Sequence, residues 1–90
     1  MTAEADAIVA RLVEHRHEFL GFLERRVGDR ALAEDLLQEA FTRSLNKADQ
    51  IEQDESAVAW FYRVLRNSLT DYQRRAGSHA RKLEALQREF

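Results

Sequence analysis

Apolar side chains recur every three or four residues along three stretches of this chain, and no proline interrupts them. This spacing puts the side chains on one face of an α-helix, because a helix turns by about 100° per residue. Only three residues are glycine, and 44% are hydrophobic. Ninety residues leave room for one small core. We therefore predict an all-α fold, with a compact bundle of three main helices plus a C-terminal helical extension.

Residues that cap helices predict the helix boundaries. The first apolar stripe spans residues 8–27. Gly28 then suits a left-handed C-cap and Asp29 suits an N-cap, so a second helix is expected over about 30–48.

A polar segment at 49–56 follows the second helix and is expected to form a loop. Ser56, or Asp54, is expected to cap a third helix that ends near residue 76. The glycine and serine that come next should weaken or bend this helix before a helical tail resumes at 79–90.

The third helix has two different faces. Relative to Arg63, the side chains of Arg66, Asn67, Thr70 and Arg74 all fall within about 60°. The opposite face is apolar and is predicted to be buried. Together with the first two stripes it predicts one core, formed by Leu12, Phe19, Leu36, Phe41, Phe61, Leu65 and Leu69.

The polar strip of the third helix suggests contact with nucleic acid. Its arginines have one acid at helical spacing, Asp71, and arginine forks bind phosphates at two points. The alternative is a strip that is simply solvated. Trp60 lies about 60° from Arg63, so it is expected either at a second buried contact or at the border of the strip.

Charge is distributed unevenly along the chain. Residues 1–55 contain seven basic and thirteen acidic side chains, whereas residues 56–90 contain seven basic and three acidic ones. A polyanion would be repelled by the first part and attracted to the second. Uneven charge is also common in short helical proteins, so this feature alone does not decide the function.

Other classes of function find little support in the sequence. There is no cysteine, and His15 and His17 would point to different sides of a helix, so we predict no metal site. No catalytic motif or glycine-rich phosphate loop is present, which argues against an enzyme and against a cofactor. We expect no membrane span and no signal peptide, and hence a cytoplasmic protein.

Two stretches of the sequence closely resemble two motifs of a known protein family, and they occur in the same order as in that family. "AEDLLQEAFTRSL" (33–45) followed by "AWFYRVLRNSLTDYQRR" (59–75) resembles region 2 of bacterial RNA polymerase sigma factors of the extracytoplasmic-function group. The resemblance covers about residues 15–80. It implies that the first stretch docks on the clamp helices of the polymerase β′ subunit, and the docking residues would be Asp35, Gln38 and Glu39.

The second stretch, by the same resemblance, recognises and melts the promoter minus-ten element. The residues contacting the non-template strand would be Trp60, Arg63, Arg66, Asn67, Thr70, Arg74 and Arg75. In the family the loop before this helix holds an unstacked base, which here would be residues 49–56. This loop carries four acids and no aromatic residue. Melting by binding alone needs no cofactor.

The resemblance also predicts how the chain is organised. Residues 1–78 would form the region 2 domain, and 79–90 would begin a linker to a missing region 4 domain. We expect a monomer and an anti-sigma factor as a further partner. An alternative is a sigma-like interaction module that binds an anti-sigma factor without contacting DNA, and the acidic loop favours it.

Overall fold

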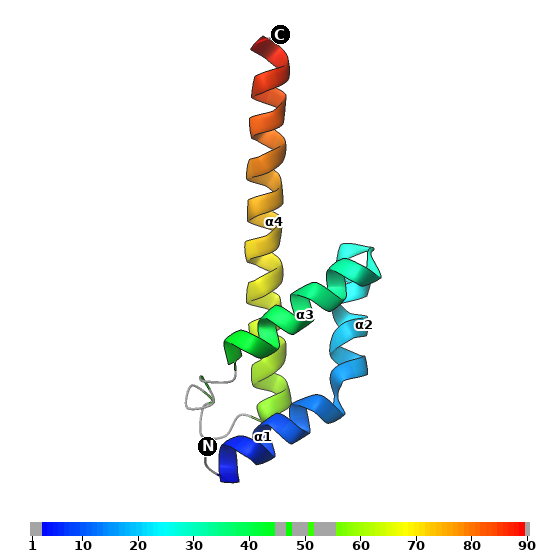
Figure 1. Ribbon diagram of the computed structural model, residues 1–90, viewed down its shortest axis with the longest axis vertical. Helices are drawn as coiled ribbons and strands as arrows, with labels where there is room; N and C mark the ends of the chain where they lie inside the picture. Colours follow the sequence, from blue (N-terminus) through cyan, green and yellow to red (C-terminus); the bar gives the residue numbers. More distant parts are fainter. Residues whose placement is uncertain (1–2, 45–46, 48–50, 52–55, 90) are drawn as a thin grey trace.

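The computed structural model describes residues 3–44, 47, 51 and 56–89 (Figure 1). These residues form four helices and no strand: α1 (Ala3–Glu14), α2 (Arg16–Val27), α3 (Arg30–Ser44) and α4 (Ala57–Glu89). The predicted all-α bundle with a C-terminal helical extension is confirmed. None of the described helices is both long and apolar enough to cross a membrane.

The first apolar stripe differs from the prediction, because it is divided between two helices at His15. The backbone there has φ −99° and ψ 13°, and the His15 N–H bonds to the Leu12 carbonyl at 3.1 Å, three residues back. Its imidazole Nδ1 lies 2.9 Å from the Arg11 carbonyl. The turn lets α1 cross beneath the bundle while α2 rises along it (Figure 1). Leu12 and Phe19 thereby reach the same core from different directions.

The predicted caps are confirmed by their hydrogen bonds. Gly28 has φ 73°, and its N–H donates to the Glu24 carbonyl at 2.9 Å, so α2 ends in a left-handed C-cap. The Asp29 carboxylate accepts from the Leu32 N–H at 3.2 Å, where α3 begins. The Ser56 hydroxyl accepts from the Ala59 N–H at 3.1 Å, in the first turn of α4. Asp54, the alternative cap, lies outside the described residues.

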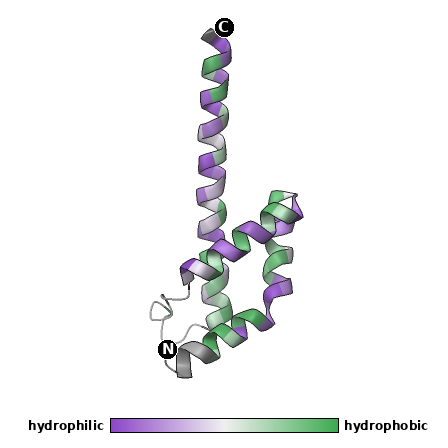
Figure 2. Ribbon diagram, viewed as in Figure 1, coloured by the Kyte–Doolittle hydropathy of each residue, from purple (hydrophilic) through white to green (hydrophobic). Residues whose placement is uncertain are grey.

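Aromatic rings form the centre of the core. The ring centroids of Phe19 and Phe61 lie 4.6 Å apart, those of Phe41 and Phe61 4.8 Å, and those of Phe19 and Tyr62 5.1 Å. Of the seven predicted core residues, six are buried and Phe41 is partly buried against them. Phe41 stacks on Phe61 and remains partly exposed. All four helices contribute hydrophobic residues to this core, and Figure 2 shows hydrophobic residues in the ribbon of each of them.

Helix α4 is longer and straighter than predicted. It runs through Gly77 and Ser78 without a break, although a bend was expected there. One glycine inside a helix costs only about 1 kcal/mol, which the continuous backbone hydrogen bonds tolerate. Every described side chain from Gln73 to Arg88 is exposed except that of Ser78, so this half of α4 stands clear of the bundle (Figure 1). The radius of gyration is 16.3 Å, against about 12 Å for a compact domain of this length.

Candidate nucleic-acid interface

The predicted strip on α4 lies on one accessible face of the helix. Arg66, Asn67, Thr70 and Arg74 are exposed, Arg63 is partly buried, and Phe61, Leu65 and Leu69 occupy the opposite, buried face. Arg75 is exposed on the neighbouring side. The Thr70 hydroxyl donates to the Arg66 carbonyl at 3.0 Å. The strip is therefore a row of cations and polar groups held on a rigid helix, with its geometry fixed by the core behind it.

Trp60 lies in the core and is only 2% exposed. Its ring centroid is 6.5 Å from that of Phe61. The expectation that Trp60 makes a second buried contact is therefore confirmed. The alternative, that Trp60 lies at the border of the exposed strip, is wrong. Where the end of α3 meets α4, it covers a side of α4 that the periodicity of α4 alone leaves open.

A small cavity of about 170 Å³ opens where the C-terminal end of α3 meets α4. Its wall combines two cations, an amide, two hydroxyls and one carboxylate with the edge of the core tryptophan: Arg43, Ser44, Lys47, Trp60, Val64, Asn67, Ser68 and Asp71. Asn67 thus joins the strip to the cavity. No pattern in the sequence points to Lys47 or to the side chains from α3, because only the fold brings them to Asn67.

Ser44 is the unusual member of this wall. Its side chain is 6% exposed, and its hydroxyl oxygen has no hydrogen-bond partner among the described residues. A buried hydroxyl without a partner costs about 1–3 kcal/mol. Rotation of the Ser44 side chain toward the cavity would let a polar group there recover that cost. Lys47 adds a cation to the same opening. Arg43, in contrast, is paired with Glu39, and Asp71 contributes a negative charge.

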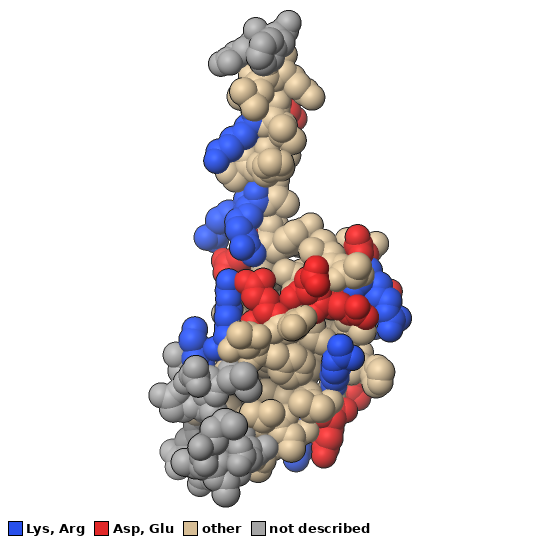
Figure 3. Space-filling model, in the orientation of Figure 1, with Lys and Arg blue, Asp and Glu red and all other residues tan. Residues whose placement is uncertain are grey.

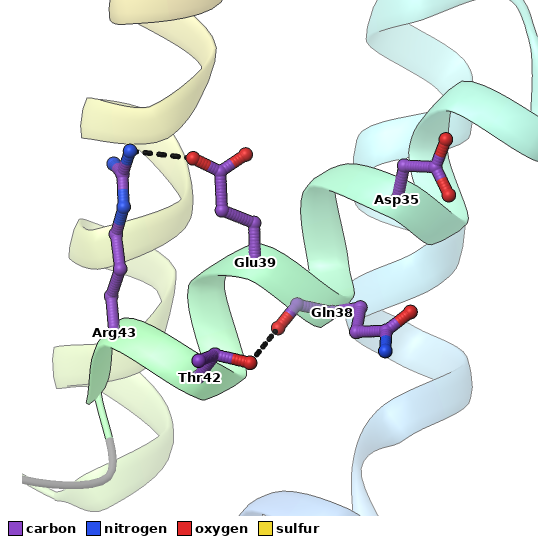
Figure 4. Close-up of a pocket in the computed structure, with 5 residues that line it drawn as sticks. All are labelled: Asp35, Gln38, Glu39, Thr42 and Arg43. Atoms are coloured by element: carbon purple, nitrogen blue, oxygen red, sulfur yellow. Dashed lines mark hydrogen bonds and ion pairs between the residues drawn. The ribbon is translucent and has the colours of Figure 1, made fainter.

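The predicted docking residues lie together on the outer face of α3 (Figure 4). Asp35 and Gln38 are exposed and Glu39 is partly buried. With Thr42 and Arg43 they line a shallow hollow of about 460 Å³. The Thr42 hydroxyl donates to the Gln38 carbonyl at 3.0 Å.

The charge on this face is lower than the sequence suggested. Glu39 forms an ion pair with Arg43, one turn further along α3 (Figure 4). Glu34 similarly pairs with Arg30, at 3.5 Å. Asp35 has no such partner among the described residues, so it is the acid of this face best able to attract a cationic partner.

Acidic and basic side chains are unevenly distributed on the surface. In the view of Figure 3, acidic side chains gather across α3, and basic side chains gather along α4 above it. The molecule therefore presents two electrically different surfaces at an angle to each other. Such an arrangement suits simultaneous contact with a cationic and an anionic partner.

The expected base-binding loop lies largely outside the described residues. Of residues 49–56, the structure describes Ile51 and Ser56. Ile51 is partly buried against the core. Capture of a base by this loop stays a prediction.

Comparison with known proteins gives two matches. The family model described as "Sigma-70 region 2" matches residues 12–79. A protein of Haemophilus influenzae described as "Probable RNA polymerase sigma factor" is 32% identical over 66 residues, which are 73% of this chain and 34% of that protein. The chain thus spans about a third of the length of this relative. No solved structure matches.

Proposed function

The chain belongs to the sigma-70 region 2 family, and on this premise we propose that it is the part of a sigma factor that joins core RNA polymerase to the promoter minus-ten element. The single observation that best supports this role is the exposed strip on α4, with Arg66, Asn67 and Arg74 opposite a buried face. We place the chain in the extracytoplasmic-function group, acting in the cytoplasm, on the two sequence stretches described above.

Melting, in this proposal, is driven by preference for the unpaired strand. Cations of the strip hold the strand by its phosphates, and the cavity beside Asn67 receives an unstacked base. Holding one base by stacking contributes about 1–3 kcal/mol, and a base-pair step costs about 1.4 kcal/mol to disrupt. The two energies are comparable, so each captured base offsets the disruption of about one base-pair step. The proposed role is not enzymatic and needs no cofactor.

The polymerase would bind on the other surface. The surface offered to the β′ clamp helices has three polar side chains. They are the acid Asp35, which has no ion-pair partner among the described residues, the amide Gln38, and the acid Glu39, which is paired within α3. Because α3 and α4 are locked together through Phe41 and Phe61, docking on α3 would fix the direction in which α4 meets the DNA. The division into a domain at 1–78 and a linker from 79 to a second DNA-binding domain stays a prediction.

An interaction module that binds an anti-sigma factor without contacting DNA is the second candidate. Leu83 and Leu86 on the free half of α4 are 47% and 53% exposed. Such apolar side chains favour a protein partner that would bury them. The anti-sigma factor is a proposed partner under both candidates.

Binding of the unpaired strand is expected to depend on Arg66 and Arg74. The Arg66→Ala and Arg74→Ala variants should each bind a labelled single-stranded minus-ten oligonucleotide more weakly, whatever its sequence. Each should also flatten the plot of log affinity against log salt by about 0.7, because one phosphate contact on a single strand is lost. Fluorescence anisotropy across a salt series measures both quantities. Unchanged binding by folded variants would favour the interaction module.

Base capture is expected to depend on Ser44. The Ser44→Ala variant should be as stable as the parent or more stable, because it removes a buried hydroxyl that has no partner. It should nevertheless lose part of its preference among minus-ten strands that differ in one base. Thermal unfolding measures the stability of the variant, and competition between such strands measures its base preference. A variant that keeps the full base preference would exclude the cavity as the base site.

A further inference from the structure

Four exposed cations surround Ser78 on the free half of α4. They are Arg74, Arg75, Arg81 and Lys82, and we call them the cationic band. From residue 72 to residue 83 the sequence contains these four cations and no acid. Within the part of the chain that the structure describes, no carboxylate lies within ion-pair distance of any of them.

Helix geometry arranges the band as two parallel edges. Arg74 and Arg81 are seven residues apart, which is nearly two full turns, so they lie on one line about 10 Å apart. Arg75 and Lys82 form a second line at the same spacing, about 100° around the helix. Gly77 lies between the two pairs, and beyond its chain neighbours and the nearby helix backbone no atom lies within 4 Å of the place where its side chain would be. The band therefore has two rows of charge on an open, rigid rod.

The band is continuous with the strip proposed to bind the promoter. Arg74 belongs to both, and α4 joins them without a break. The match to the sigma-70 region 2 model ends at residue 79, so Arg81 and Lys82 lie beyond it. Because α4 is continuous, Arg81 and Lys82 keep a fixed position relative to Arg66 and Asn67. They lie on the half of α4 that extends beyond the bundle.

We propose that the cationic band binds the phosphate backbone of the double-stranded DNA next to the melted segment. Two features favour duplex over unpaired strand. The duplex presents a regular array of phosphates, about one per 1.7 Å of axis, to which fixed rows of cations can match. Residues 73–88 also contain no Phe, Tyr or Trp, the side chains on which unpaired bases stack. This inference rests on the proposed function, and it adds a contact that is independent of base sequence.

The test compares two labelled DNAs bound to the complete 90-residue chain. One is a single-stranded minus-ten oligonucleotide, and the other carries the same strand as an overhang on a duplex of about one helical turn, roughly 10 base pairs. We expect the Arg81→Ala/Lys82→Ala variant to bind the single strand like the parent and the fork more weakly. On the fork the salt slope should fall by nearly 2. When salt rises from about 50 to about 200 mM, the two phosphate contacts that the variant lacks should account for about a tenfold part of the parent's loss of affinity for the fork.

A matched control removes the same charge elsewhere. The Arg16→Ala/Arg25→Ala variant changes two exposed cations of α2 and should bind both DNAs like the parent. Circular dichroism checks that both variants keep their helices. A scrambled duplex sequence should make no difference to the parent.

Three outcomes overturn the inference. If the Arg81→Ala/Lys82→Ala variant binds the fork like the parent, the cationic band does not bind the duplex. The proposed function then still stands, provided that Arg66→Ala weakens single-strand binding. If the parent binds neither DNA, both fail. If the Arg81→Ala/Lys82→Ala variant loses affinity for single-stranded RNA but not for the fork, the band is an RNA contact instead.

Discussion

Replacing Leu65 by alanine is expected to lower the free energy of unfolding by about 2–5 kcal/mol. Leu65 is fully buried in the core between α4 and the rest of the bundle. The smaller side chain would leave a cavity that the surrounding rings cannot fill without moving. In a domain of this size each 1 kcal/mol shifts the thermal midpoint by about 4–8 °C, so differential scanning calorimetry will resolve the change.

Leu83 provides the matched control for this substitution. It is a leucine on the same helix but is 47% exposed, so Leu83→Ala should change the stability by no more than about 0.5 kcal/mol. Equal effects of the two substitutions would contradict the assignment of the buried face. They would also mean that the free half of α4 packs against something in solution.

Reversing the charge of Asp35 is expected to have the largest effect on docking to the polymerase. Asp35 is exposed on α3 and has no ion-pair partner among the described residues, so its whole charge is available to a cationic surface. Asp35→Arg would place two cations against each other, and disruption of a close interfacial charge pair costs about 2–5 kcal/mol. Affinity for the β′ clamp fragment should therefore fall by at least about thirtyfold, at 1.4 kcal/mol per factor of ten. Calorimetric titration measures it.

Glu14 serves as the control for charge reversal. It is exposed at the C-terminal end of α1, where an acid is unfavourable to the helix dipole. Glu14→Arg changes the net charge by the same amount as Asp35→Arg but should leave the affinity intact. If the two reversals weaken binding equally, the interaction is a general attraction to net charge, and the α3 face is not the docking surface.

The sequence alone determined those features that depend on neighbours along the chain. Gly28, Asp29 and Ser56 cap their helices by bonds that reach no more than four residues. The buried face of α4 also followed from the helix period, because Phe61, Leu65 and Leu69 must share one side of any helix that contains them. The ion pair between Glu39 and Arg43 was not predicted, although the spacing of an acid and a base four residues apart on a helix is the signal that could have predicted it.

Only the tertiary structure decided the features that join distant segments. The period of the first stripe is compatible with one helix, and the turn at His15 gains its stability from the core contacts that it allows on both sides. Trp60 is buried beside a cavity that it lines together with Arg43 and Ser44 of α3, and the helix period contains no information about those neighbours. The cavity that joins Ser44 and Lys47 to Asn67 draws on residues at least twenty positions apart. Helical bonds act over a single turn, whereas packing depends on which surfaces the whole chain brings together, and this is why the strip was predictable and the cavity beside it was not.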